Sequence, residues 1–198
     1  WFALTLVAFV SHSFWVYAGV TAIILTVTRQ RERNPVTLFF FLLFLIPPAS
    51  AQVPGFGLVN YFVDLNHVRI LSLCVLLPAF LALRRKPDTL PFGRIWPDKL
   101  LLAFLLLTAA LSLRQTTPTD TLRHSLTLFF DVFLPYYVAS RALKNVSDFK
   151  DALLGFLLAA MVLSLIGLFE FSRRWLLYNA LTDAMGVQLQ AAHERIGQ

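Results

Sequence analysis

The chain has 198 residues, of which 58% are hydrophobic and 14% are charged, and its mean hydropathy is +0.69. A soluble globular domain usually carries about 25% charged residues, so this composition excludes an ordinary soluble protein. The net charge of +6 is not accompanied by a nucleic-acid-binding motif, and the basic residues lie in short segments between apolar runs. We therefore expect a lipid bilayer as partner and no nucleic acid.

Six apolar segments are predicted to be membrane helices, because each reaches or approaches the roughly 20 residues that a helix needs to cross a bilayer core. In chain order they cover residues 3–28, 36–53, 66–84, 98–114, 121–142 and 149–172. The predicted fold is therefore all-α, a polytopic transmembrane helix bundle over residues 1–172. The first helix is interrupted by Ser11, His12 and Ser13, so a broken helix is an alternative there.

Prolines are expected to interrupt three of these helices. Pro47-Pro48 is predicted to end or kink the second helix, and Pro78 and Pro135 to kink the third and the fifth. The physical reason is that proline lacks a backbone donor and its ring clashes with the preceding helical turn.

The segment 173–198 is predicted to leave the membrane. Its first part is too polar to span, but Leu177, Leu181 and Ala184 recur at helical spacing, with Trp175 and Tyr178 nearby. That pattern favours a short helix lying along the membrane surface, followed by the start of a periplasmic segment.

The distribution of Lys and Arg predicts the orientation. The alternate loops 29–33, 84–99 and 141–150 hold three, five and three of them, which is 11 of the 17. Loops that stay in the cytoplasm are enriched in these residues. We therefore expect a multi-pass protein of the bacterial inner membrane, with residues 84–99 cytoplasmic and 171–198 periplasmic.

Few residues carry recognisable chemistry. The sequence has no zinc-binding Cys/His spacing, no phosphate-binding glycine loop and no nucleophile elbow, so no metal and no cofactor is expected. Asp131 lies within an apolar helix, and His124 lies seven residues earlier on about the same face. An ionisable residue inside a membrane usually faces the bundle interior, so the pair indicates either a buried polar site or a hydrogen bond between packed helices.

Two arginines lie near the predicted outer face, and taken alone Arg195 is expected to be a solvated surface residue and Arg174 to pair with Glu170 at the membrane interface. Arg195 follows the surface helix and precedes Gly197, and Arg174 lies near the end of the sixth apolar run. An arginine stays protonated and offers a planar fork of donors that matches phosphate oxygens. In the outer loop before the third helix, Asp64 and Asn66 are placed to line the mouth of a site.

Several stretches resemble the N-terminal half of the O-antigen ligase and O-antigen polymerase superfamily. They are RERNPVTLFFFLLFLIPP, QVPGFGLVNYFVDLNHVRIL, WPDKLL, TDTLRHSLTLFFDVFLPYYVASRAL and DFKDALLGFLLAAMVLSLIGLFEF, which together cover nearly the whole chain. The resemblance implies a GT-C-like inner-membrane glycosyltransferase of lipopolysaccharide or polysaccharide biosynthesis. Such an enzyme moves a glycan from undecaprenyl pyrophosphate to a hydroxyl of lipid A-core or of another glycan at the periplasmic face, without metal or nucleotide.

The resemblance also implies roles for particular residues. An arginine in an R-x-x-G-like context is expected to hold the pyrophosphate, and Arg195-Ile196-Gly197 is similar to it, with Arg174 as a second candidate. The catalytic histidine of the family is expected in a later periplasmic loop. None of the four histidines of this chain takes its place, and the chain by itself is expected to be inactive.

Two alternatives remain open. One is half of a polytopic transporter or flippase for a lipid-linked or anionic substrate, which is favoured if Asp131, His124 and the interrupted helices line a path through the bilayer. The other is a membrane scaffold without catalytic activity.

Overall fold

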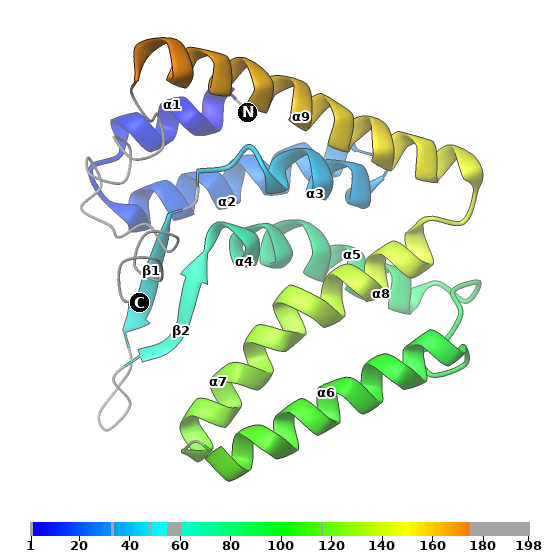
Figure 1. Ribbon diagram of the computed structural model, residues 1–198. Coiled ribbons are helices and arrows are strands. Elements are labelled where there is room, and N and C mark those ends of the chain that lie inside the picture. The colour runs from blue at the N-terminus through cyan, green and yellow to red at the C-terminus, as the bar shows by residue number, and fades with distance from the viewer. Residues whose placement is uncertain (1, 33, 48, 55–60, 116, 175–198) are drawn as a thin grey trace.

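The computed structural model describes residues 2–32, 34–47, 49–54, 61–115 and 117–174, and these are mostly helical (Figure 1). The elements, in chain order, are α1 (Phe2–Val10), α2 (Phe14–Arg31), α3 (Pro35–Leu43), β1 (Ser50–Pro54), β2 (Tyr61–Asn66), α4 (His67–Leu71), the π-helical segment η1 (Ser72–Leu76), α5 (Leu77–Arg85), α6 (Trp96–Gln115), α7 (Pro118–Leu128), the π-helical segment η2 (Phe129–Phe133), α8 (Leu134–Ala142) and α9 (Val146–Arg173).

Three helices of the described chain are long and apolar enough to cross a membrane. They cover His67–Arg85, Trp96–Arg114 and Val146–Arg173. These correspond to the predicted segments 66–84, 98–114 and 149–172, so their boundaries are confirmed to within a few residues. The fifth predicted segment forms one continuous helical run, α7 to α8, but it is not among the three.

The prediction of a helix over 36–53 is wrong. The helix α3 ends at Leu43, and the chain then turns and enters β1, which pairs antiparallel with β2 in a two-stranded sheet. Ser50 lies opposite Asn66 and Gln52 opposite Asp64, with an irregularity between Gln52 and Pro54. The prediction failed because the apolar run continues past Pro47, whereas a helix cannot. The expected all-α fold therefore carries a β-hairpin in addition to its helices.

The first predicted helix is broken, as the alternative proposed. α1 ends at Val10, the chain bends, and α2 begins at Phe14. Ser11 donates its hydroxyl to the carbonyl of Val7 and its amide to the same oxygen. Such local bonding by serine competes with continuation of the helix.

The prolines in the third and fifth helices are both preceded by a π-helical segment. Cys74 and Asp131 lie four residues before Pro78 and Pro135, and each is the central residue of its segment, η1 or η2. A proline ring clashes with the carbonyl four residues earlier. The widened turn relieves that clash, so the expected interruption is a π-helical turn rather than a break in the helix.

Hydrogen-bonding side chains fix where several helices begin. The side chain of Asn34 accepts from the amide of Val36 at the start of α3, and that of Asn66 accepts from Arg69 at the start of α4. Thr117 does the same for Asp120 in α7. Asparagine and threonine are favoured at this position because their oxygens satisfy amides that lack a helical partner.

The apolar core lies between α1, α2, α3, α4, η1, α5 and α8. α9 packs along α3 through a stripe of small buried residues that includes Ala152, Gly155 and Ala159. A Cβ added at Gly155 would lie 2.8 Å from the carbonyl oxygen of Thr37, so this close approach requires glycine. Small residues commonly let membrane helices approach each other in this way.

The helices α6 and α9 expose most of their large apolar side chains. Among the α6 residues whose side chains are described, Asp98 alone is buried. Apolar faces of this kind are expected on helices that face lipid rather than water.

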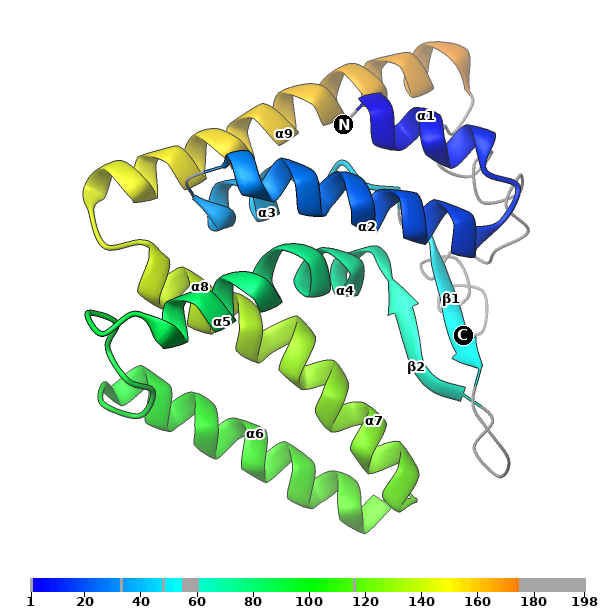
Figure 2. The ribbon, with the colours of Figure 1, turned by 180° about the vertical axis from the view of Figure 1, so that it is seen from behind.

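The loops gather at two opposite ends of the bundle (Figures 1 and 2). One end, called here the basic end, holds the connections between α2 and α3, α5 and α6, and α8 and α9. The other, the hairpin end, holds β1–β2 and the α6–α7 turn. The three segments with the most Lys and Arg thus lie together, as the predicted topology requires.

The interfacial helix predicted for 173–198 is tested only at its start. α9 continues to Arg173, and Arg174 follows with a left-handed backbone (φ 52°) that ends the helix. A left-handed residue is a common way for a helix to stop. Residues 175–198, including Arg195, lie outside the described part of the chain.

Candidate functional site

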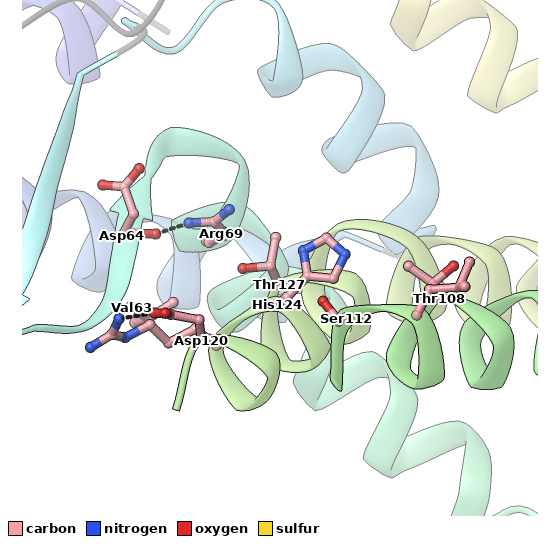
Figure 3. Close-up of a pocket in the computed structure, with 10 residues that line it drawn as sticks. Val63, Asp64, Arg69, Thr108, Ser112, Asp120, His124 and Thr127 are labelled. Atoms are coloured by element: carbon pink, nitrogen blue, oxygen red, sulfur yellow. Dashed lines mark hydrogen bonds and ion pairs between the residues drawn. The ribbon is translucent and has the colours of Figure 1, made fainter. Parts of the chain in front are cut away.

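A polar cavity of about 600 Å³ lies at the hairpin end, where α6 and α7 meet the sheet and α4 (Figure 3). We call it the hairpin-end cavity, and its lining residues are Val63, Asp64, Arg69, Thr108, Leu111, Ser112, Asp120, Arg123, His124 and Thr127. Its volume lies in the range of small-molecule sites, about 300–1,000 Å³.

Arg69 connects this cavity to the helix core. It lies in α4, two residues into the helix that Asn66 caps, and its side chain is 10% exposed. Its guanidinium donates to the backbone carbonyl of Asp64, as Figure 3 shows, and to Oδ2 of Asp131 at 3.2 Å. These two partners come from different elements, so they fix the guanidinium beside the cavity wall.

Asp131 is therefore part of an ion pair between helices. Its side chain is 27% exposed, and its Oδ1 has no hydrogen-bond partner among the described residues. The Nε of Arg69 is likewise unpartnered within that part of the chain. Both atoms are buried, so one acceptor and one donor of the pair stay unused inside the protein.

The two predicted polar residues, Asp131 and His124, are related through Arg69. His124 lines the hairpin-end cavity, whereas Asp131 pairs with Arg69 without lining it. The structure therefore places both near one arginine but in different roles. Sequence analysis did not single out Arg69; the available signal was an arginine in the first turn of an apolar helix.

Hydroxyl and charged groups surround His124. Thr108 and Ser112 lie one turn apart on α6, and Thr127 follows on α7. Arg123 pairs with Asp120 at 2.5 Å in the first turns of α7. The wall therefore presents two arginines and two aspartates together with hydroxyl groups, a set suited to a ligand with both anionic and hydroxyl groups.

Asp64 and Asn66 were predicted to lie in an outer loop and line the mouth of a site, but both lie in the strand β2. Asp64 lines the hairpin-end cavity. The side chain of Asn66 instead accepts the amide of Arg69 at 2.9 Å as the cap of α4.

A second ion pair lies at the basic end, and sequence analysis missed it. Arg141 donates to Oδ2 of Asp98 at 2.5 Å, and both side chains are nearly inaccessible, with 2% and 0% exposed. Asp98 also accepts from the hydroxyl of Tyr136 at 2.7 Å and from the amide of Gly93 at 2.9 Å. The guanidinium of Arg141 lies over the ring of Tyr137, 4.7 Å from its centroid.

Of the two arginines proposed from sequence to bind phosphate, Arg174 is within the described residues and Arg195 is not. Arg174 is exposed at the end of α9 and does not line the hairpin-end cavity. Arg195 lies outside the described residues. Within the described ranges, no group of three His, Cys, Asp or Glu side chains is placed to hold a metal ion.

Comparison with known proteins adds no assignment: no family model matches the chain, and neither does any curated protein or solved structure. The class that the fold defines is a helical membrane protein with a polar cavity at one end of the bundle.

Proposed function

We propose that this chain belongs to a GT-C-like glycosyltransferase of the inner membrane that transfers a glycan from undecaprenyl pyrophosphate to a hydroxyl of lipid A-core or of another glycan. The sequence resemblance suggests this reaction. The single structural observation that supports it best is the hairpin-end cavity, which combines arginines and hydroxyl groups at the end of the bundle opposite the basic loops.

The chemistry of this transfer suits the groups in the cavity. The acceptor oxygen forms a bond to the anomeric carbon, the bond from that carbon to the pyrophosphate oxygen breaks, and the electron pair leaves with undecaprenyl pyrophosphate. The proton of the acceptor hydroxyl passes to a general base, which the resemblance assigns to a part of the protein beyond this chain. What remains for these residues is to position the donor and to stabilise the developing charge.

In this proposal the two arginines of the cavity have different tasks. Arg69 is fixed by Asp64 and Asp131 and approaches the anionic donor from the core side. Arg123, held by Asp120 on α7, approaches from the other side. The hydroxyl oxygens of Thr108, Ser112 and Thr127 can accept from sugar hydroxyls, and Arg195 and Arg174 remain the proposed ligands of the pyrophosphate.

A bulky substitution tests whether the hairpin-end cavity is the site of glycan transfer. Thr108 lines the cavity, and its hydroxyl donates to the carbonyl of Phe104 at 2.8 Å. Thr26 makes the same bond to Ala22 at 2.7 Å on an exposed face of α2. Thr108→Phe in the full-length protein should abolish most glycan transfer at equal expression, whereas Thr26→Phe should leave it near normal. Equal activity of the two variants would refute the cavity as the site.

One observation favours the transporter alternative as a second candidate. The Arg69–Asp131 pair lies between two helical runs that are both widened by π-helical segments, and charged pairs of this kind occur on substrate paths. Proteoliposomes distinguish the two functions. Movement of lipid-linked glycan across the bilayer without an acceptor supports the transporter, and product formation that requires the acceptor supports the transferase.

A further inference from the structure

A second cavity lies at the basic end, far from the hairpin-end cavity. It has a volume of about 330 Å³, and we call it the basic-end cavity. Its lining comes from the ends of α2, α5 and α8 and the start of α3: Arg29, Glu32, Pro35, Ala79, Ala82, Leu83, Lys86, Arg141, Ala142 and Lys144.

The lining of this cavity is positively charged, although Asp98 behind the wall balances the charge of Arg141. Four of the lining residues are Lys or Arg and one is acidic, so the lining carries a formal charge of +3. The cations come from three separate chain segments, around Arg29, Lys86 and Arg141–Lys144. A run of basic residues in one loop is usually a solvated face, but the fold brings these together around one hollow.

The cations differ in how firmly they are held. Arg141 is 3% exposed and is fixed by Asp98 and Tyr137. Lys144 donates to the backbone carbonyl of Asp88 at 3.4 Å. Arg29 and Lys86 make no ion pair among the described residues, so their charge remains available to an incoming anion.

The remaining lining allows a headgroup to enter. Ala79, Ala82 and Ala142 are small side chains that leave space between the helices. Helices with exposed apolar faces adjoin this end, so a ligand with an acyl tail can keep its tail in lipid while its phosphate enters the cavity. Basic pockets between membrane helices on the cytoplasmic side are suited to phospholipid headgroups.

We infer that the basic-end cavity binds a phosphate-bearing anion and that its source is the headgroup of an anionic phospholipid in the leaflet at the basic end. Arg29, Lys86 and Lys144 contact the phosphate, and Arg141 forms the back of the site. This binding is separate from glycan transfer, and neither the transferase nor the transporter alternative requires it.

The test is lipid binding by the purified full-length protein in detergent, measured by native mass spectrometry with added phosphatidylglycerol or phosphatidylethanolamine. We expect preferential retention of phosphatidylglycerol. Lys86→Gln with Lys144→Gln should weaken it by about 30-fold, because each lysine near anionic lipid contributes about fivefold. The matched control is Lys99→Gln with Lys150→Gln, which removes the same charge from exposed lysines that do not line the cavity.

Three results would overturn the inference. The first is an equal loss in the control double variant, which would mean diffuse attraction to surface charge. The second is equal retention of both lipids by the wild-type protein. The third is displacement of the lipid by glycerol 3-phosphate at an equal concentration, which would identify a soluble phosphate compound as the ligand.

Discussion

Two arginine–aspartate pairs join helices at opposite ends of this bundle, and they differ in how fully the oxygens of the aspartate are used. At the basic end, Asp98 accepts from Arg141, Tyr136 and Gly93 and is completely buried. At the hairpin end, Asp131 meets Arg69 through one oxygen, remains 27% exposed and leaves the other oxygen unpartnered among the described residues.

The difference suggests that the two pairs serve different purposes. The Asp98 carboxylate already accepts from three donors and is inaccessible, so the Asp98–Arg141 pair chiefly fixes α6 against α8, although Nε of Arg141 has no partner among the described residues. The Arg69–Asp131 pair makes fewer contacts, is partly exposed, and its arginine lines the hairpin-end cavity. The two arginines each line a cavity, so the difference lies in the aspartates, one fully used for structure and the other with a single donor.

The largest expected effect is at Asp98. Asp98→Asn leaves Arg141 buried without its counter-charge, and breaking such a pair costs about 3–5 kcal/mol. The free energy of unfolding in detergent micelles should fall by that amount. Asp88→Asn, which alters an exposed acid in the neighbouring loop, is the matched control and should stay within about 0.5 kcal/mol of wild type. A loss below about 1 kcal/mol at Asp98 would contradict a structural role for this pair.

The next effect concerns glycan transfer. If Arg195 holds the pyrophosphate, Arg195→Ala removes a charge-assisted contact of about 1.5–3 kcal/mol. Glycan transfer by the full-length protein should fall by about one to two orders of magnitude. Arg195→Lys should recover part of this loss, because it keeps the charge without the fork, and Arg174→Ala should cost less. Near-normal transfer by Arg195→Ala would show that the arginine is only a solvated residue.

Packing next to the basic end provides a further comparison. Gly155→Ala places a Cβ against the Thr37 carbonyl and should force α9 away from α3, at about 1–3 kcal/mol of unfolding free energy. Gly167→Ala on the same helix meets nothing within 4 Å and should be neutral or slightly stabilising. Thermal unfolding of both variants checks this, and equal melting temperatures would contradict the close α3–α9 contact.

The smallest expected effect on stability is at Asp131. Asp131→Asn keeps an acceptor for Arg69, Arg69 keeps the Asp64 carbonyl, and the Asp131 side chain is partly exposed, so the free energy of unfolding should fall by about 1 kcal/mol, well below the loss at Asp98. Glycan transfer should nevertheless fall, because the arginine loses its orienting charge. A destabilisation as large as that of Asp98→Asn would remove the proposed difference between the two pairs.

Hydropathy predicted those parts of the fold in which an apolar run fills a whole helix. α6 and α9 were located to within a few residues for this reason, as was the helix over 67–85. The same rule failed at residues 44–53, where apolar side chains continue but the backbone turns into a strand. Prolines marked the positions of η1 and η2, although not their π-helical form.

The candidate site was less accessible from sequence. Asp131 and His124 were identified because polar residues are rare in apolar helices. Their common neighbour Arg69 lies 62 residues from Asp131, and Asp98 lies 43 residues from Arg141. Pairings at such separations depend on how helices pack, which periodicity and composition do not encode. Arg69 and Arg141 both lie near the ends of apolar runs, where a charged residue is ordinarily an interfacial one.

The central claim is that the two ends face opposite sides of the membrane, with the hairpin-end cavity outside. The background is a variant in which the native Cys74 is replaced. A single cysteine is introduced either at Val53 in the hairpin or at Pro87 in the basic end. Intact spheroplasts are then treated with a membrane-impermeant thiol reagent. The account predicts labelling at position 53 and none at position 87 until the membrane is permeabilised. Labelling at 87 with none at 53 would contradict it.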